Sequence, residues 1–524
     1  MPILPENFSR WLLAVLEILA ALFVFALGAL VLAALVMYVI DRVQTQHTVR
    51  RNFPLIGRFR YAFERLGEFF RQYFFAMDRE ELPFNRAQRS WVYRAAKDLD
   101  NTIAFGSTQD IHRPGAIIFA SSLFPPLDQE TQPAQPVTLG PFCRQPYTTR
   151  AILNVSAMSY GALSQPAVLA LSMGAARAGC WLNTGEGGLA PAHLSGGCDV
   201  VFQIGTAKYG VRDADGRLSE ARLRELAALE QVKMFELKLS QGAKPGKGGI
   251  LPKEKISREV SAIRGIPLGE DSISPNRHPE IESIADLLDM VEHVREVTGK
   301  PTGFKMVIGA YGWLDEFCEE ILRRGVEHAP DFITVDSADG GTGAAPMPLI
   351  DYVGLPIWES LPMLCDILTR YGLKSRIRVI ASGKLINPAE VAWALCVGAD
   401  FVTSARGFMF ALGCIQSLQC NKNTCPTGIA THKKSLQRGL DVTDKSERVR
   451  RYAERVSQEV CMIAHSCGCD EPRKLTRDHA RIMGPSGVSL SLRDYYERWS
   501  APHSVHALNG IDRPVFERAT GTDG

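Results

Sequence analysis

Three cysteines lie close together in residues 401–431, which read FVTSARGFMFALGCIQSLQCNKNTCPTGIAT. Cys414, Cys420 and Cys425 are six and five residues apart, and Pro426 follows the last of them. Thiolates gathered this closely, without the regular cysteine pattern of a secreted disulfide scaffold, are typical of a soft-metal or iron–sulfur site. The spacing alone leaves a second interpretation open, in which these are buried free thiols and Cys414 faces the core from a helix.

Seven polar positions or segments, most of them rich in glycine, each follow or end a short apolar run. They are SAMSYG at 156–161, NTGEGG at 183–188, KLSQGAKPGKGG at 238–249, Lys305, DSADGGTG at 336–343, SGK at 382–384 and SARG at 404–407. One such loop would be a turn and nothing more. Seven on one face of a fold indicate a binding site.

The apolar runs themselves are typical of buried parallel strands separated by amphipathic helices. We expect strands at 151–156, 179–183, 200–204, 233–239, 303–308, 332–336, 378–381 and 400–403. We expect helices at 166–178, 220–229, 284–298, 314–324, 357–371 and 388–396. This pattern predicts an α/β fold, a (β/α)8 TIM barrel, with its chemistry in the loops after the strands. A doubly wound sheet is the alternative, but no Gly-x-Gly-x-x-Gly follows the first strand.

Two of these features suggest how an anionic ligand is held. Glycines after the seventh and eighth strands let backbone amides approach a phosphate. Lys305, at the end of a strand, would place a positive charge where an anion is bound; the alternative is a solvated strand end. The segment 242–249 resembles a phosphate-binding P-loop, but it is one residue short and lacks the Ser or Thr that holds Mg²⁺, which argues against a nucleoside triphosphatase.

Five long runs occur in an order that resembles a known family. They are SAMSYGALS, NTGEGG, KLSQGAKPGKGGILP, DSADGGTGAAP and CIQSLQCNKNTCPTGIAT, within residues 151–431. Together they are similar to the FMN-binding synthase domain of glutamate synthase. The resemblance implies an FMN oxidoreductase acting on CH–NH2 donors, which converts 2-oxoglutarate and ammonia through 2-iminoglutarate to L-glutamate. It also implies a [3Fe–4S] cluster on Cys414, Cys420 and Cys425.

The same resemblance assigns further residues. The implied flavin contacts are Met158, Ser159, Asn183, Lys305, Asp339, Gly340, Gly341, Gly383, Ser404 and Ala405. The implied catalytic and substrate-binding residues are Glu186, Gln241 and Lys244. Lys244 would hold or polarise the oxo-acid, and Glu186 would orient the nitrogen or manage its proton. The alternative for these two is a buried ion pair that braces the loops.

The chain departs from the family in three respects. It begins Met1-Pro2 with an apolar stretch, where full-length relatives carry a glutaminase domain with an N-terminal cysteine nucleophile. We therefore expect ammonia to come free or from a glutaminase partner. No nicotinamide or FAD module is recognisable, so a donor protein, a ferredoxin or a reductase, is expected to supply electrons. Ile250 stands where the family often has Gln, which leaves other amines or oxo-acids open as substrates.

The N-terminal segment is long and apolar. Residues 18–40 carry no charge, and 23 residues exceed the ~20 that cross a bilayer as a helix. A signal peptide would have an apolar part of about 7–15 residues. Arg10 precedes the stretch, whereas Arg42, Arg50, Arg51, Arg58 and Arg60 follow it. The positive-inside rule predicts a single-pass protein of the inner, cytoplasmic membrane with its catalytic domain in the cytoplasm.

Four regions follow from these patterns: an anchor at 1–45, a helical and loop region at 46–145, the barrel at 146–435 and a helical extension at 436–524. Residues 61–75 have aromatic residues at helical spacing and either pack against the protein or lie along the membrane surface. Residues 444–465 predict an amphipathic helix packed on the barrel. Cys461, Cys467 and Cys469 lack a familiar ligand spacing and are interpreted as structural thiols.

The composition excludes one class of partner. A formal net charge of +2 with 22% charged residues gives no basis for binding nucleic acid. Two alternatives to a synthase remain: a membrane-tethered electron-transfer subunit whose catalysis belongs to a partner, and a barrel that has lost its flavin and acts as a scaffold. The intact loops and cysteines argue against the scaffold.

Overall fold

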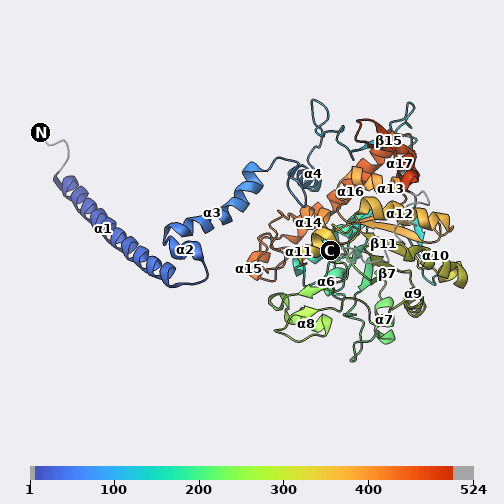
Figure 1. The fold of residues 1–524 in the computed structure, drawn as a ribbon, viewed down its shortest axis with the longest axis horizontal. Coiled ribbons are helices and arrows are strands. Elements are labelled where there is room, and N and C mark those ends of the chain that lie inside the picture. Colours follow the sequence, from blue (N-terminus) through green and yellow to red (C-terminus); the bar gives the residue numbers. More distant parts are fainter. Residues whose placement is uncertain (1–5, 500–524) are drawn as a thin grey trace, which may run out of the picture. The chain divides into compact units, whose positions relative to one another are not determined.

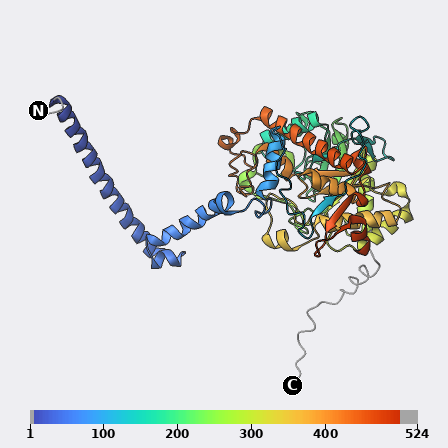
Figure 2. The same ribbon diagram turned by 90° about the horizontal axis from the view of Figure 1, so that it is seen from above.

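A computed structural model describes residues 6–499. The chain forms two compact units, Met1–Ala87 and Gln88–Gly524, and each is described by itself. Figure 1 and Figure 2 show the two units in two views.

The first unit is helical. Its elements are α1 (Glu6–Val43), α2 (Thr48–Asn52), α3 (Ile56–Phe70) and a π-helical turn, η1 (Arg71–Phe75). Within α1, residues Arg10–Val43 are long and apolar enough to cross a membrane. The predicted span 18–40 lies inside this helix, and most of its side chains are exposed.

The second unit contains the predicted barrel, which is confirmed as a closed, parallel, eight-stranded one. In order around the barrel its strands are β4 (Leu153–Val155), β5 (Leu182–Asn183), β6 (Val200–Ile204), β7 (Val232–Lys238), β10 (Thr302–Met306), β11 (Phe332–Asp336), β12 (Arg378–Ser382) and β13 (Phe401–Ser404). β13 closes the circle by pairing with β4 in parallel register, Val402 opposite Leu153. Each of the eight expected strands is found, with bounds shifted by at most a few residues.

Helices follow the strands on the outside of the barrel. They are α5 (Gln165–Ala178), α6 (Pro191–Leu194), α7 (Glu220–Ala227), α9 (Ile284–Thr298), α10 (Trp313–Arg324), α12 (Ile357–Arg370), α13 (Pro388–Cys396) and α14 (Arg406–Leu412). Capping explains several bounds: the side chains of Ser164, Ser219, Ser283 and Asn387 accept a backbone N–H from the first turn of their helices. Gly299, with a φ of 70°, ends α9. The sequence pattern missed α6, because a four-residue helix carries no periodicity.

A hairpin that the sequence pattern missed closes the amino end of the barrel. It consists of β2 (Val137–Leu139) and β3 (Tyr147–Thr149), which pair antiparallel. Leu139 and Tyr147 from this hairpin belong to one buried cluster with Trp181, Phe332 and other residues near the strand starts. The barrel is therefore filled with packed side chains at this end. We call this packed layer, together with the β2–β3 hairpin, the hairpin floor.

Insertions follow two of the strands. Between β7 and α9 lie β8 (Ile250–Leu251), η2 (Lys253–Lys255), α8 (Arg258–Arg264) and β9 (Ser272–Ile273), with β8 and β9 paired antiparallel. A short helix, α11 (Met347–Tyr352), follows β11, and a 3-10 turn, η3 (Val326–His328), follows α10.

The C-terminal region is mostly helical, as expected, but it also contains strands. α15 (Lys434–Gln437) precedes α16 (Val442–Ser466), which packs along α5, α13 and α14. β14 (Ala480–Met483) pairs with β15 (Ser489–Ser491) and with β1 (Ile117–Phe119) from the region before the barrel. The remaining elements are α4 (Arg86–Ala96), η4 (Pro472–Lys474), η5 (Arg477–His479) and α17 (Leu492–Trp499). Residues 500–524 of the predicted extension lie outside the described residues.

Candidate functional site

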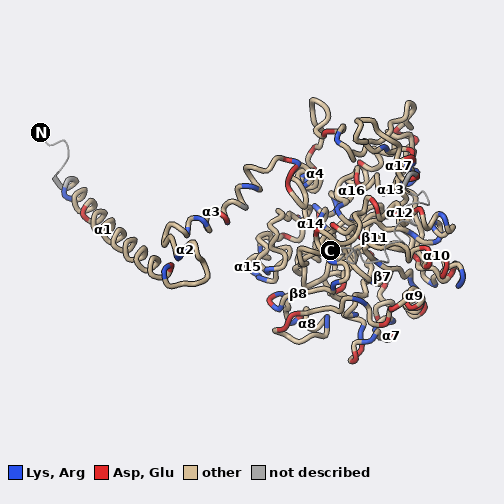
Figure 3. Tube along the Cα trace, viewed as in Figure 1, with Lys and Arg blue, Asp and Glu red and all other residues tan. Residues whose placement is uncertain are grey.

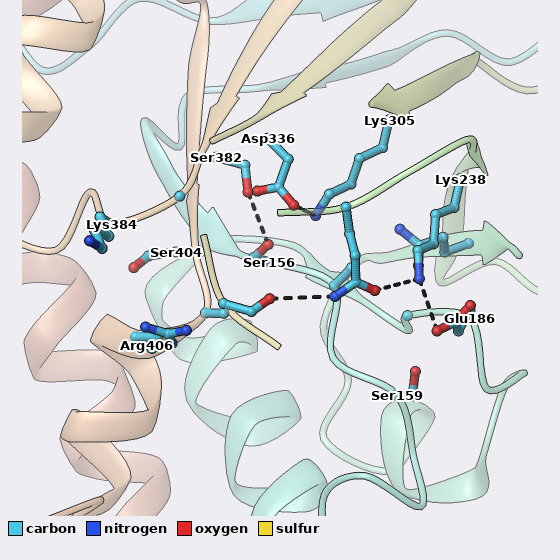
Figure 4. Close-up of a pocket in the computed structure, with 17 residues that line it drawn as sticks. Ser156, Ser159, Glu186, Lys238, Lys305, Asp336, Ser382, Lys384, Ser404 and Arg406 are labelled. Atoms are coloured by element: carbon cyan, nitrogen blue, oxygen red, sulfur yellow. Dashed lines mark hydrogen bonds and ion pairs between the residues drawn. The ribbon is translucent and has the colours of Figure 1, made fainter. Parts of the chain in front are cut away.

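A cavity opens at the carboxyl ends of the barrel strands, and we call it the mouth cavity (Figure 4). Its wall is built by Ser156, Ala157, Ser159, Gly185, Glu186, Gln203, Lys238, Gln241, Lys305, Asp336, Gly341, Ser382, Gly383, Lys384, Ser404, Ala405 and Arg406. Because parallel strands all end at the same side of a barrel, residues far apart in sequence meet here. The expectation that the polar loops share one face is confirmed.

Lys305 is a buried part of this wall. Its Nζ lies 3.2 Å from Asp336 Oδ2, and the backbone N–H of Gly242 donates to the same oxygen at 2.9 Å. Lys305 is only 5% exposed, so the alternative of a solvated strand end is wrong. A buried cation that lines a cavity is available to an anionic ligand as well as to its carboxylate.

A second cation lies beside Lys305 in the wall of the mouth cavity (Figure 4), because Lys305 of β10 and Lys238 of β7 are partners on neighbouring parallel strands. Lys238, the last residue of β7, has its Nζ 2.9 Å from Glu186 Oε1 and donates to Gln241 Oε1 at 2.5 Å. The amide of Gln241 in turn donates to the carbonyl of Gly341 at 3.4 Å. Burial raises the pKa of Glu186, but the charge of Lys238 outweighs it and the net pKa lies below its ordinary value. Glu186 is therefore an anion at neutral pH.

Lys244 lies in the same loop and is almost fully buried. Burial, with the neighbouring charge of Lys238, lowers its pKa from 10.5 to about 8, while Glu186 opposes the shift. Within residues 6–499, the Nζ of Lys244 donates no hydrogen bond to another residue. The alternative of a Glu186–Lys244 ion pair is therefore wrong, because the lysine that contacts Glu186 is Lys238.

Glycines allow the loops around the cavity to approach one another. A Cβ on Gly383, whose φ is 111°, would lie 2.5 Å from the Cβ of Ser337. A Cβ on Gly341 would lie 2.7 Å from Nε of Arg406, and one on Gly249 would lie 2.3 Å from Glu186 Oε1. These contacts are made within the protein, so the glycines are required for loop packing whether or not a ligand is bound.

Six of the ten residues expected to contact a flavin line the mouth cavity. They are Ser159, Lys305, Gly341, Gly383, Ser404 and Ala405. Asn183 lies deeper, in a second and smaller cavity inside the barrel, where its amide donates to Glu236 Oε1 at 2.8 Å. Asp339 pairs with Lys384 at 2.7 Å, and Met158, Gly340 and Lys244 are likewise absent from the wall of the mouth cavity.

Several wall residues were given no individual role from the sequence, although all but Gln203 lie in the polar segments predicted to form the site. They are Ser156, Ala157, Gly185, Gln203, Lys238, Asp336, Ser382, Lys384 and Arg406. Most stand at or just beyond a strand end, and that position was the signal that could have found them. Lys238 was taken as part of the strand itself, although the alternation of the strand directs it into the cavity.

The wall suits a phosphorylated, aromatic cofactor such as FMN. Hydroxyls of Ser156, Ser382 and Ser404 lie on one side, and Lys305 supplies a positive charge. This set of groups can hold a phosphate and the polar edge of a flavin.

The three cysteines follow α14, the helix after β13, close to the mouth cavity. Arg406 lines the cavity and also interacts electrostatically with Cys420 and Cys414, while Cys420 interacts in turn with Cys425. In residues 6–499, no three His, Cys, Asp or Glu side chains converge closely enough to form a metal site. The three thiols thus lie near one another and are the donor type that iron–sulfur sites use. Their sulfur atoms do not converge on one point as a complete set of ligands would.

The cysteine segment has an unusual backbone. Gln416, Leu418 and Asn423 have φ values of 57°, 53° and 55°, a region that side chains other than glycine rarely adopt. The backbone N–H of Gln416 donates to the Sγ of Cys414 at 3.5 Å, and buried Lys255 donates to the carbonyl of Cys420 at 3.1 Å. Strain of this kind persists where the surroundings hold a loop in a functional shape.

The tail cysteines lie elsewhere, beside α16. Cys469 Sγ is 3.5 Å from Nε2 of His479, and Cys467 Sγ contacts the carbonyl of His479 at 3.8 Å. The backbone N–H of Thr476 donates to Nδ1 of His479 at 3.0 Å, so Nε2 carries the proton in the neutral ring. Cys461 is partly exposed. These contacts agree with structural thiols.

Comparison with known proteins identifies the family. The model of the conserved region in glutamate synthase matches residues 127–470, which cover the whole barrel. The chain belongs to the glutamate synthase family. The resemblance found in the sequence is thereby confirmed, and the cavity lies within the matched region.

Three relatives show how far the similarity to glutamate synthase extends. The glutamate synthase large subunit-like protein YerD of Bacillus subtilis is 37% identical over 517 residues, covering 91% of this chain and 98% of that one. The archaeal glutamate synthase [NADPH] of Methanocaldococcus jannaschii is 33% identical, covering 63% of this chain and 62% of that one. The glutamate synthase large subunit-like protein of Rhizobium meliloti is 30% identical, covering 62% and 74%. The first of these similarities extends beyond the barrel.

Proposed function

We propose that this protein catalyses the reductive amination of 2-oxoglutarate to L-glutamate with FMN as its redox cofactor. The observation that carries the proposal is the mouth cavity, where Lys305 and the Lys238–Glu186 pair lie side by side in the wall. Such a site places positive charges around a phosphate and a dicarboxylate substrate. It also leaves the carboxylate of Glu186 to bind the nitrogen substrate.

FMN would be held by the loops after β12 and β13. Gly383, Ser404 and Ala405 are the residues for its phosphate, and Lys305 is the one for the edge of the ring where negative charge develops. Met158, Ser159, Asn183, Asp339, Gly340 and Gly341 are the remaining proposed contacts. When bound, FMN would supply the hydride that reduces the imine carbon.

The catalytic residues that we propose act on the two substrates separately. Lys244 binds a carboxylate or the oxo group of 2-oxoglutarate, with Gln241 as a neutral donor beside it. Glu186, which is ionised and held by Lys238, binds an ammonium ion and accepts one of its protons, so that the freed amine can attack the oxo carbon. Condensation releases water, and reduction then requires one hydride and one proton.

We propose that Cys414, Cys420 and Cys425 hold a [3Fe–4S] cluster through which electrons enter. Support comes from the donor set and from Arg406, which connects the cysteine segment to the cavity wall. The electrons would come from a donor protein, a ferredoxin or a reductase. Ammonia would come from solution or from a glutaminase partner.

One experiment tests the synthase. The protein is purified without oxygen, its iron and FMN are counted per chain, and the reduced form is mixed with 2-oxoglutarate and ammonia. We expect the flavin to reoxidise as glutamate forms, with no reoxidation when ammonia is omitted. A protein that holds both cofactors but does not reoxidise would contradict the synthase and favour an electron-transfer subunit. Because Ile250 replaces a polar residue of the family, other oxo-acids are compared in the same assay.

We further propose that α1 crosses the cytoplasmic membrane once and leaves the barrel in the cytoplasm. Figure 3 shows that α1 carries few charged residues, whereas basic residues follow it in α2 and α3. The positive-inside rule gives this orientation. Protease added to intact spheroplasts should leave the barrel uncut, and cleavage of the barrel would contradict the orientation.

A further inference from the structure

The helix that follows the proposed span has two chemically different faces. At 100° per residue, Ile56, Phe59, Phe63, Leu66 and Phe70 of α3 fall within an arc of about 80°. The opposite side carries charged residues, among them Arg58, Glu64 and Arg65, while Arg60 lies at the edge of the apolar arc. This arrangement is typical of a helix that lies at a boundary between an apolar and an aqueous phase.

The apolar face of α3 is exposed in the first unit. Exposed fractions are 73% for Ile56, 61% for Phe59 and 66% for Phe63. The face continues into η1, where Phe74 and Phe75 are 67% and 72% exposed. Exposed aromatic residues that follow one another along one face mark a binding surface rather than a set of isolated surface residues.

Ion pairs fix the start of α3 against the end of α1. Asp41, which is 0% exposed, has Oδ1 3.0 Å from Nη2 of Arg50 and Oδ2 2.7 Å from Nε of Arg58. The backbone N–H of Leu55 donates to Asp41 Oδ2 at 3.1 Å. We call these contacts the Asp41 clasp. They place the first turn of α3 beside the last turn of the helix proposed to cross the membrane.

Charge supplies the remaining argument. Residues 41–71 contain seven arginines and three acidic residues, so this stretch has a net charge of +4 (7 − 3), with Arg50 and Arg58 paired to Asp41. Arginine forks bind phosphate oxygens in two-pronged geometry, and basic residues beside a membrane span attract anionic lipid headgroups. An aromatic face flanked by arginines, attached at the end of a span, matches the boundary between acyl chains and headgroups.

We propose that α3 and η1, residues 56–75, lie in the surface of the bilayer that α1 crosses, with the aromatic face in the acyl chains and the arginines on anionic headgroups. The inference rests on the proposed crossing by α1. Its occupant is the lipid surface, and not another protein or a second copy of this chain. The enzyme would then be held to the membrane by a span and by a surface helix.

The full chain, in vesicles of phosphatidylcholine and phosphatidylglycerol in equal amounts, tests this arrangement. Phe63 is replaced by the photoreactive residue p-benzoyl-phenylalanine, and in a matched variant the neighbouring polar-face residue Glu64 is replaced by the same group. After irradiation, adducts to lipid and to protein are measured separately by mass spectrometry. We expect lipid adducts from position 63 at several times the yield from position 64.

Each other outcome overturns the inference. Protein adducts from position 63 would show that another chain or domain covers the aromatic face, and equal lipid yields from both positions would show that α3 is not oriented. Flotation of the vesicles separates the two proposals: protein that does not float has no anchor, whereas protein that floats without lipid adducts at position 63 has only α1 as an anchor. Amide hydrogen exchange of residues 56–75 gives a second measurement, with slow exchange expected in vesicles.

Discussion

Replacement of Lys244 by Met should weaken the binding of 2-oxoglutarate by about 10- to 100-fold. The side chain is buried and no acceptor in the described part of the chain is recorded for its ammonium group, so the charge is available to a substrate carboxylate. A hydrogen bond to a charged partner contributes ~1.5–3 kcal/mol, and each 1.4 kcal/mol is about a factor of ten in affinity. Calorimetric titration of the oxidised enzyme with 2-oxoglutarate, without ammonia, measures the effect directly.

The pH dependence adds an independent signature. Because the pKa of Lys244 is about 8, the free enzyme loses this charge above that pH, and affinity for 2-oxoglutarate should fall about tenfold for each further pH unit. In Lys244→Met this decline should disappear. The same affinity and the same pH profile in both proteins would refute the assignment of Lys244 to the substrate.

Stability distinguishes a lost contact from a damaged fold. The folded pKa of Lys244 lies below its usual 10.5, so the native state binds fewer protons than the unfolded state between about pH 8 and pH 10.5. The free energy of unfolding therefore rises with pH between these two values. Below about pH 8, where Lys244 is charged in the folded protein, its burial costs ~3 kcal/mol. Lys244→Met removes this cost, so its unfolding temperature at neutral pH should not decrease.

Three further substitutions test other parts of the structure. Gly383→Ala should reduce the FMN content and destabilise the protein by ~2 kcal/mol, because its Cβ meets Ser337 at a φ of 111°; normal flavin absorbance and an unchanged denaturant midpoint would contradict this. Cys425→Ser should lower the iron per chain and leave FMN in place, and iron analysis decides whether it does. Asp41→Asn should open the Asp41 clasp and speed trypsin cleavage after Arg50 in vesicles, and an unchanged cleavage rate would argue against the clasp.

The barrel could be predicted from the sequence because its strands are buried on both sides. Runs such as 332–336 are mostly apolar, and the helices between them carry caps like Asn387 with Pro388, so both element types leave strong local signals. The position of the polar loops then followed from the topology. A closed parallel barrel brings every strand end to one face, whatever lies between the strands.

Contacts within the site could not be predicted in the same way. The sequence places Lys238 and Lys244 in one loop, and only the folded geometry decides that Lys238 contacts Glu186. The hairpin floor was missed because each of its strands has three residues, too few to show alternation. The strands near the C-terminus, β14 and β15, were missed because they too are short. In addition, β14 pairs with β1, which lies before the barrel in the sequence.

The hairpin floor closes one end of the barrel, so the mouth cavity has no opening at that end. Tyr147 and Trp181 pack edge to face with ring centres 6.3 Å apart, and Trp181 packs on Phe401 at 5.1 Å, so the end opposite the mouth cavity is plugged by aromatic rings. The proposed product must then depart along the path by which the oxo-acid arrived. Glutamate should consequently act as a competitive inhibitor toward 2-oxoglutarate, and a noncompetitive pattern in steady-state kinetics would reveal a second exit.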